Sequence, residues 1–392
     1  MLRLRPNKHM TFVARHPWVL AKSLDEPETR PADGEVVDVV AANGRFVARG
    51  IYNSKSHIRA RLYSWNPDEP LDDGFWIRRL DSALQLRRDI GYDDPAGAAR
   101  LVFSEADGLS GLIVDRYAEW LVIQVAALAV DKRLDALVAA LVERTQPRGV
   151  LVRTDAKIAV AEGMEVREGV IWGESPAGPI TIRENQLDFS VDLLGGQKTG
   201  MYLDQRENRR VAAGYLSGRD VLDVCCYVGG FSLAAAKLGR ARSVLGIDAS
   251  EKAIEQARAN ATANGVENAQ FEVGECFETL ELLRNEGRRF GAVILDPPKF
   301  AGSRHGVDQA LRAYFRLNRL AVEVLEPGGM LITCSCSGRV TRDDFLHMLA
   351  GVAQKTSRDL QVLEPRGPAP DHPVRLSCPE TDYLKCYICR AT

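Results

Sequence analysis

Two short segments carry side chains that could act together on a substrate. The first is "DPPKF", which opens with Asp296, and the second is "CSCSG", which contains Cys334 and Cys336. Two consecutive prolines restrict the backbone behind the aspartate, so its carboxylate is held with little conformational freedom. A thiol placed beside it could act as a nucleophile.

Both segments follow apolar runs that are typical of buried strands. Two earlier runs also end in acids: "VLDV" contains Asp223 and leads to a turn with Gly229, and "SVLGID" ends in Asp248. From residue 187 onward, predicted strands and helices alternate, as a parallel doubly wound sheet requires. Since parallel strands end at one edge of such a sheet, we expect these side chains to line one crevice.

The crevice has features of a nucleoside pocket. A glycine turn lets the backbone approach a ligand closely, and Asp248 could accept hydrogen bonds from ribose hydroxyls. Glu275, after the run "QFEVG", is a candidate partner for an adenine. The turn lacks the G-x-G-x-x-G pattern, which favours an adenosyl group over a pyrophosphate and weakens a dehydrogenase interpretation. Alternatively, Asp248 only caps the helix that follows it.

The thiol has a specific use if the substrate is a nucleobase. Carbon 5 of cytosine is a poor nucleophile, but addition of a thiolate to carbon 6 makes it reactive toward a methyl sulfonium. Cys336 would emerge at the end of its strand, and Asp296 would hydrogen bond to the ring nitrogen and amine of the base. Cys334 would lie deeper on the same strand, where we expect it to pack in the core. Cys336 could also be a packing residue, because free cysteines are commonly buried.

The rest of the chain predicts two further domains. Residues 1–72 contain short alternating strands around Asn43-Gly44, as in a small β barrel, and 73–186 mix helices and strands as in an α+β domain. The third domain, 187–392, is the α/β one. All eight cysteines lie in it, and "CYIC" at 386–389 is interpreted as a strand rather than a zinc motif, so no metal is expected.

The N-terminal end is the candidate nucleic-acid surface. Residues 1–65 have 11 Lys or Arg against 6 Asp or Glu, while the whole chain has a formal charge of −2. The basic residues predicted to contact RNA there are Arg45, Arg49, Lys55, Arg59 and Arg61. No signal peptide is evident and the apolar run at 120–130 is shorter than the roughly 18 residues of a membrane span. We therefore expect a cytoplasmic protein without membrane contact.

The motifs together resemble a known family. "GGQKTGMYLDQRENR", "CCYVGGFS", "DPPKF" and "SCSG", behind "RHPWV" and "GRFVARGIYN", closely resemble the bacterial ribosomal RNA large subunit methyltransferase I family, over nearly the whole chain. The resemblance implies a PUA barrel that binds RNA, an α+β middle domain, and a Rossmann-like domain that uses S-adenosylmethionine to make 5-methylcytosine in 23S ribosomal RNA.

The resemblance also implies roles for individual residues. Cys336 would be the nucleophile and Asp296 would open the base-binding motif with Pro297, Pro298 and Lys299. The residues implied at the cofactor or in the catalytic cleft are Tyr202, Asp204, Gln205, Arg206, Asp223, Tyr227, Gly229, Asp248, Glu275 and Asp296, with Asn208 on the same segment. Lys299 stands where related two-cysteine enzymes have a second Cys, so either water or Lys299 would remove the C5 proton.

Two other functions remain open from the sequence. An N-methyltransferase acting on guanine or adenine would use the same cofactor pocket without the thiol. A non-catalytic RNA-binding or ribosome-assembly factor would need the barrel but not the cofactor. The sequence leaves open which cytosine is modified, whether the substrate is naked RNA or an assembling subunit, and the oligomeric state, a homodimer included.

Overall fold

The computed structural model of the protein describes residues 1–26, 29–195, 200–300 and 306–392. Residues 196–199 of the "GGQKTG" motif lie outside the described residues. The chain forms two compact units, and each is described here by itself. Unit 1 comprises Met1–Ile182, Val191–Leu203 and Pro370–Thr381, and unit 2 comprises Arg183–Ser190, Asp204–Ala369 and Asp382–Thr392. The predicted boundaries of three domains at 72 and 186 stay a prediction.

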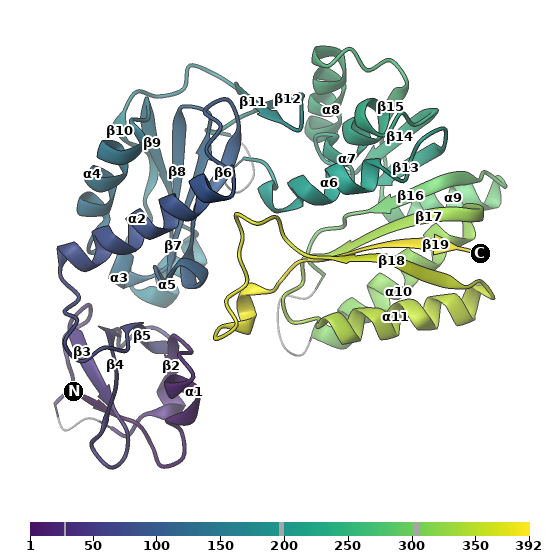
Figure 1. Cartoon of the computed structure of the whole chain (residues 1–392). Coiled ribbons are helices and arrows are strands. Elements are labelled where there is room, and N and C mark those ends of the chain that lie inside the picture. The colour runs from purple at the N-terminus through teal and green to yellow at the C-terminus, as the bar shows by residue number, and fades with distance from the viewer. Residues whose placement is uncertain (27–28, 196–199, 301–305) are drawn as a thin grey trace. The chain divides into compact units, whose positions relative to one another are not determined.

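The first 65 residues fold into a small five-stranded sheet with a core of its own, as the alternating pattern predicts (Figure 1). The tight turn at Asn43-Gly44 joins two antiparallel strands, and Gly44 has φ +84°, a conformation that favours glycine. The elements are β1 (Leu2–Arg3), α1 (Met10–Val13), β2 (Trp18–Leu20), β3 (Val36–Val40), β4 (Phe46–Tyr52) and β5 (Ile58–Ser64), in the sheet order β1-β3-β4-β5-β2.

A second five-stranded sheet follows, flanked by helices. Asp72 caps the first of these helices by accepting a hydrogen bond from the Phe75 amide at 2.8 Å. The elements are α2 (Asp73–Asp89), β6 (Ala98–Phe103), β7 (Leu112–Tyr117), β8 (Trp120–Val125), α3 (Leu128–Asp131), α4 (Leu134–Thr145), β9 (Gly149–Arg153), α5 (Ala156–Glu162) and β10 (Glu168–Gly173), in the sheet order β10-β9-β8-β7-β6. The mixture of helices and mostly antiparallel strands confirms the α+β prediction.

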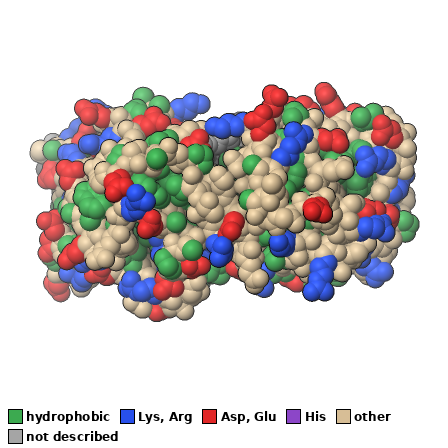
Figure 2. Space-filling model, turned by 90° about the horizontal axis from the view of Figure 1, so that it is seen from above, with side chains coloured by type: hydrophobic (Ala, Val, Ile, Leu, Met, Phe, Trp, Pro, Cys, Tyr) green, Lys and Arg blue, Asp and Glu red, His purple; other side chains and the backbone are tan. Residues whose placement is uncertain are grey.

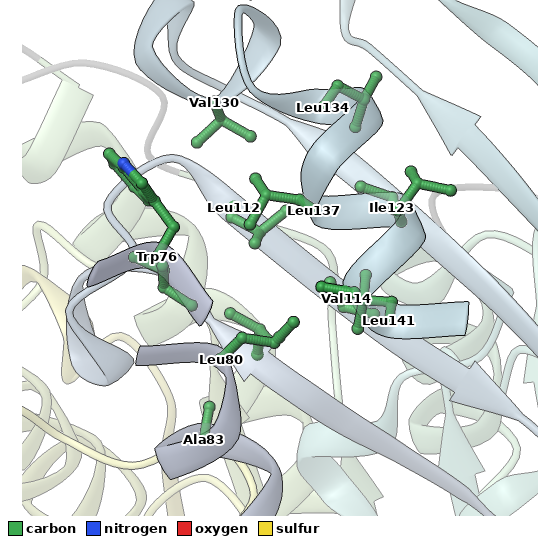
Figure 3. Close-up of a cluster of buried hydrophobic side chains, with 14 of the residues drawn as sticks. Trp76, Leu80, Ala83, Leu112, Val114, Ile123, Val130, Leu134, Leu137 and Leu141 are labelled. Atoms are coloured by element: carbon green, nitrogen blue, oxygen red, sulfur yellow. The ribbon is translucent and has the colours of Figure 1, made fainter. Parts of the chain in front are cut away.

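The core of this region lies between the helices and one face of the sheet. Figure 3 shows side chains of α2 and α4 converging on those of β7 and β8. Tyr63 and Ile51 of the N-terminal sheet join the same cluster of buried side chains, and the Tyr63 ring packs edge-on against Trp76 at 4.7 Å. The two sheets of unit 1 therefore share buried apolar surface, which stabilises them as one body.

The C-terminal part of unit 2 carries a seven-stranded sheet. Its apolar strands form the core together with α10. The strands are β13 (Asp220–Val224), β14 (Ser243–Asp248), β15 (Ala269–Val273), β16 (Phe290–Leu295), β17 (Leu325–Ser335), β18 (Leu360–Arg366) and β19 (Lys385–Ala391), in the order β15-β14-β13-β16-β17-β19-β18.

The sheet is not parallel throughout, which corrects the predicted doubly wound parallel sheet. Strands β13 to β17 are parallel, but β19 pairs antiparallel with both β17 and β18. "LKCYIC" is a strand, as predicted, and it is inserted between its two partners rather than added at the edge. Antiparallel pairing lets the chain pass from β18 back to β19 without a crossover α-helix.

Helices cover both faces of this sheet. Figure 1 shows α6, α7 and α8 on one side and α10 and α11 on the other. The bounds are α6 (Arg206–Ala213), α7 (Gly230–Leu233), α8 (Glu251–Ala263), α9 (Cys276–Asn285), α10 (Val307–Glu323) and α11 (Arg342–Thr356), and the hairpin β11 (Ile180–Glu184) and β12 (Leu187–Val191) precedes them. Within the described ranges, none of the helices combines the length and apolar character that crossing a bilayer requires.

Candidate active site and cofactor pocket

The four predicted strand ends meet at one edge of the sheet. Asp223 is the fourth residue of β13, Asp248 is the last of β14, and Asp296 and Cys336 directly follow β16 and β17. Because these strands are parallel neighbours, their carboxyl ends point to the same side. The structure thus brings together the carboxylates and the thiol that the sequence singles out.

The turn after β13 is held in an unusual conformation. Cys225 and Tyr227 have φ +64° and +52°, and Gly229 has φ +84°. The Tyr227 amide donates to Asp248 Oδ2 at 2.9 Å, which fixes the turn against β14. Non-glycine residues seldom adopt positive φ, and such strain is concentrated at binding sites.

Asp248 does not cap the helix after it. The N-cap of α8 is Ser250, whose hydroxyl accepts from the Ala253 amide at 3.3 Å. Asp248 Oδ1 accepts from the Ser250 amide at 2.9 Å, and its other oxygen holds the Tyr227 turn. The simpler alternative, a capping residue only, is therefore wrong, and the carboxylate lies beside the turn.

Glycine is required where the turn enters α7. A Cβ at Gly229 would lie 3.2 Å from the Phe271 ring, and one at Gly230 would lie 2.7 Å from Arg209 Nε. No space is left for a side chain on that side of the turn. Packing against Phe271 and Arg209 therefore favours glycine at both positions, and the absence of side chains is compatible with a ligand close to the backbone.

Asp223 carries an oxygen that has no hydrogen-bond partner among the described residues. Its residue is fully buried, Oδ2 accepts from the Ser232 hydroxyl at 2.6 Å, and Oδ1 accepts no hydrogen bond from the described residues. Burial raises the pKa of Asp223 to about 7, with the carboxylates of Asp296 and Asp248 adding to the effect. A buried acceptor without a partner is costly, so a donor on a ligand would be stabilised there.

Asp296 is oriented by a chain of hydrogen bonds. Gln205 Nε2 donates to Asp296 Oδ1 at 2.9 Å, and Gln205 Oε1 accepts from Asn208 Nδ2 at 2.6 Å. Asn208 Oδ1 in turn accepts from Arg366 Nε at 2.9 Å. Since Arg366 can only donate, the direction of every bond in the chain is determined. Gln205, predicted at the cofactor or in the cleft, thus contacts the Asp296 carboxylate directly.

Cys336 lies next to the Asp296 motif. Its Sγ is 4.0 Å from the carbonyl oxygen of Pro297, and the residue is half-buried. Cys334, by contrast, is fully buried opposite Cys386 of β19, and burial raises the pKa of its thiol well above the usual value. The prediction that Cys334 packs in the core is confirmed. Lys299 and Pro298, later in the motif, are exposed.

Three other predicted cofactor residues have different surroundings. Asp204 Oδ2 accepts from the Tyr383 hydroxyl at 2.5 Å, and its Oδ1 is a second buried acceptor without a partner among the described residues. Glu275 is the exposed N-cap residue of α9. Tyr202 belongs to unit 1, so its place at the pocket stays a prediction.

Arg206, another predicted cofactor residue, lies beside the β11–β12 hairpin. Its Nε lies 3.8 Å from Glu184 Oε2 of the β11–β12 hairpin, where Arg209 also pairs with Glu184 at 2.7 Å. Residues at the start of α6 therefore contact two different groups: Gln205 and Asn208 lie toward Asp296, whereas Arg206 and Arg209 pair with the hairpin. We accordingly leave Arg206 out of the proposed cofactor contacts.

The predicted RNA-binding residues fall into two groups, those held in ion pairs within unit 1 and those exposed to solvent. Arg61 is 9% exposed and pairs with Glu105 and Glu162 at 3.3 and 3.1 Å, and Arg49 pairs with Asp38 at 2.7 Å. The prediction that Arg61 contacts RNA is therefore wrong, because its guanidinium stabilises unit 1 internally. Arg45 and Lys55 are exposed and Arg59 is half-buried. On the face drawn in Figure 2, basic and acidic side chains are interspersed.

One group of potential metal ligands occurs in the described part of the chain. His16, Cys378 and Glu380 of unit 1 have their donor atoms within 4.8 Å of one another. The Trp18 amide donates to His16 Nδ1 at 3.2 Å, so Nε2 carries the proton and donates to Glu380 at 3.2 Å. In this arrangement His16 and Glu380 form a hydrogen-bonded pair.

Several site residues were missed from the sequence. Tyr383, Arg366 and Lys385 contact the segments that carry Asp204, Asn208 and Cys336. Each lies well over 40 residues from its partner along the chain, and "EPR" or "YLK" carries no motif by itself. Only the pairing of β19 with β17 and β18 brings them to the site.

Comparison with known proteins agrees with this geometry. Residues 166–374 match the S-adenosylmethionine-dependent methyltransferase family and residues 2–65 match the PUA-like domain. The sheet order, the strand-end carboxylates and this match define the chain as an S-adenosylmethionine-dependent methyltransferase.

Curated relatives identify the family within this class of methyltransferases. Proteins named ribosomal RNA large subunit methyltransferase I are 40% identical in Photobacterium profundum, covering 96% of this chain and 95% of the relative, and 38% identical in Aeromonas hydrophila, covering 98% and 97%. The chain belongs to the ribosomal RNA large subunit methyltransferase I family, as the motifs suggest.

Solved structures share the fold over the whole chain. A Streptococcus mutans protein described as a SAM-dependent methyltransferase is 20% identical with a TM-score of 0.85, and covers 99% of both chains. The methyltransferase SMU.776, solved in complex with SAH, is 21% identical with a TM-score of 0.86 over 100% of both chains. At such identities these two structures support the fold alone.

Proposed function

We propose that this enzyme methylates carbon 5 of a cytosine in 23S ribosomal RNA, through a covalent bond between Cys336 Sγ and carbon 6 of the base. The observation that carries the proposal is the position of the Cys336 thiol beside the Asp296-Pro297 segment, 4.0 Å from the Pro297 carbonyl oxygen. A nucleophile and a rigidly held carboxylate at neighbouring strand ends are what this chemistry needs.

The protein's groups act on the base in a defined order. The Cys336 thiolate adds to C6, and the electrons move through the ring so that C5 becomes nucleophilic. Asp296, in its carboxylic acid form, donates its proton to N3 as the negative charge builds up there, and its other oxygen accepts a hydrogen bond from the exocyclic amine. The proton returns from N3 to Asp296 when the ring is restored. After C5 is methylated, its proton leaves, the double bond re-forms and the Cys336–C6 bond breaks. Lys299 and water are the candidate proton acceptors.

S-adenosylmethionine supplies the methyl group as an electrophilic sulfonium. The residues that would hold it are those around the β13 turn, Asp223, Tyr227, Gly229 and Asp248, and the further candidates are Glu275 at the start of α9 and Asp204 just before α6. The buried acceptor Asp223 Oδ1 fits the hydroxyl or ammonium donors of this cofactor. The glycine turn fits the close approach of its backbone.

Ribosomal RNA is the substrate that the names of the relatives and the PUA-like domain support. The base must leave the stack to reach the strand ends, so a loop or an unfolded part of an assembling subunit is favoured. Arg45, Lys55 and Arg59 are the candidates for contacts with flanking phosphates.

The test is to identify the methylated nucleoside. Purified enzyme would be incubated with 23S ribosomal RNA transcripts and S-adenosylmethionine labelled on the methyl group, and the RNA digested to nucleosides. We expect label in 5-methylcytidine with the wild type and none with Cys336→Ala. Label in N-methylated guanosine or adenosine, retained in Cys336→Ala, would instead establish the alternative N-methyltransferase.

A further inference from the structure

A buried lysine lies behind the nucleophile. Lys385, the first residue of β19, pairs in register with Ser335 of β17 and is only 1% exposed. Its Nζ donates to the carbonyl oxygens of Ser337 at 2.7 Å and Tyr383 at 2.9 Å. A buried ammonium is costly, so its retention at this position calls for a role.

Both acceptors belong to the segments that form the site. Ser337 follows Cys336 directly, and its hydroxyl lies 3.0 Å from the Tyr314 hydroxyl. Tyr383 donates to Asp204 through its own hydroxyl. Lys385 therefore ties the turn that carries the thiol to the loop that holds Asp204, and it fixes the direction of the chain just after Cys336.

The charges around Lys385 leave its ammonium without a carboxylate partner. Among the described residues, no carboxylate oxygen lies within 4.0 Å of Nζ. The charged groups that face it are Asp382, Cys336, Arg342 and Asp344. Asp382 is bound by Arg342 at 2.8 and 2.9 Å, and Asp344 by the Thr341 hydroxyl at 2.7 Å. Burial lowers the pKa of Lys385 to about 8, with Asp382 and Cys336 opposing the effect.

We propose that Lys385 is a positioning residue for the nucleophile, because its ammonium fixes the Cys336–Ser337 turn and stabilises the thiolate form of Cys336. The inference rests on the proposed function only in taking Cys336 as the nucleophile. The S–H proton passes to solvent, and below about pH 8 the lysine is mostly protonated and supplies the neighbouring positive charge. A positive charge near a thiol favours the thiolate.

The test measures Cys336 itself, without RNA. The full-length enzyme is treated with iodoacetamide from pH 5 to pH 10, and the rate at which the Cys336 peptide is alkylated is followed by mass spectrometry. Lys385→Gln keeps a donor for the carbonyls and removes the charge, whereas Lys385→Met removes both. Arg390→Gln, an exposed change on the same strand, is the matched control, and Cys276 is the internal reference thiol.

We expect the midpoint of the Cys336 profile to rise by about one pH unit in Lys385→Gln and Lys385→Met, and to stay unchanged in Arg390→Gln. The Cys276 profile should not move. Coincident Cys336 profiles in the wild type and a folded Lys385→Gln would overturn the proposal.

Two further comparisons keep the result decisive. If neither lysine variant folds, the wild-type enzyme provides the test. A midpoint of the Cys336 alkylation profile below the ordinary thiol pKa of about 8.5 supports the proposal, and a midpoint at or above that value refutes it. If the profile shifts but Cys336→Ala still makes 5-methylcytidine, then Lys385 acts on the thiol as proposed while the covalent mechanism fails.

Discussion

At the residue scale, the site depends on a few polar atoms in apolar surroundings. Asp223 shows this most directly, since its carboxyl is fully buried and only one of its oxygens is paired within the described chain. Its neighbours Asp248 and Asp296 are acids as well, and their charges add to the cost of ionising it. The enzyme without ligand therefore holds an unfavourable carboxylate at the proposed cofactor pocket.

This cost predicts a pH-dependent gain in stability on replacing Asp223. A raised pKa in the folded state means that folding binds a proton, so stability falls as pH rises from the unfolded value near 3.8 to about 7. Asp223→Asn removes this loss and should stabilise the ligand-free protein above pH 7 by roughly 1–4 kcal/mol. Urea unfolding at pH 5 and pH 8 checks this, and a difference that does not grow between the two would contradict it.

At the scale of elements, two segments far apart in the chain orient the carboxylate of a third. α6 and its N-cap supply Asn208 and Gln205, the end of β18 supplies Arg366, and together they hold Asp296 after β16. If this series of hydrogen bonds is interrupted at Asn208, the Gln205 amide loses its fixed orientation. Misplacing a catalytic group by about 1 Å is enough to slow a reaction strongly.

Asn208→Ala should therefore lower kcat by on the order of 10-fold or more, with a small effect on the affinity for S-adenosylmethionine. Steady-state kinetics together with calorimetric binding of the cofactor separate the two quantities. Arg210→Ala, which removes an exposed pair with Glu207 on the same helix, is the control. A loss in Arg210→Ala equal to that in Asn208→Ala would attribute the effect to the helix as a whole.

The strand ends were predictable because each apolar run stops at a polar residue before a turn, as at Asp248 and Asp296. The antiparallel insertion of β19 was not predictable, since "LKCYIC" shows a strand without showing its neighbours. The same holds for Lys385, whose importance comes from its cross-strand partner Ser335. Burial of Arg61 depends on Glu105 and Glu162, which lie 44 and 101 residues away.

At the scale of the whole molecule, basic residues near the N-terminus have two kinds of surroundings. Arg61 stabilises unit 1 from inside, whereas Arg45 and Lys55 face solvent. The chain's formal charge of −2 means that RNA affinity must come from local contacts rather than from a strongly positive molecule.

Substitutions should separate the effect of the buried arginine on stability from the effect of the exposed residues on RNA binding. Arg61→Met leaves two buried carboxylates unpaired and should destabilise the protein by roughly 3–5 kcal/mol. Arg45→Gln with Lys55→Gln should leave stability unchanged, weaken RNA binding and reduce the salt dependence of binding by about one phosphate contact for each residue. Thermal unfolding and filter binding at several salt concentrations measure both. An unchanged salt dependence in the double variant would place the RNA surface elsewhere.

The proposed covalent bond between Cys336 and the base can be trapped, which tests the mechanism most directly. Ribosomal RNA fragments containing 5-fluorocytosine would be incubated with S-adenosylmethionine and the wild type, Cys336→Ala or Cys334→Ala, then resolved under denaturing conditions. Fluorine cannot leave C5 as a proton does, so the intermediate should accumulate. We predict a stable protein–RNA adduct with the wild type and Cys334→Ala and none with Cys336→Ala. Absence of an adduct in all three proteins, while each still methylates unmodified RNA, would contradict the mechanism.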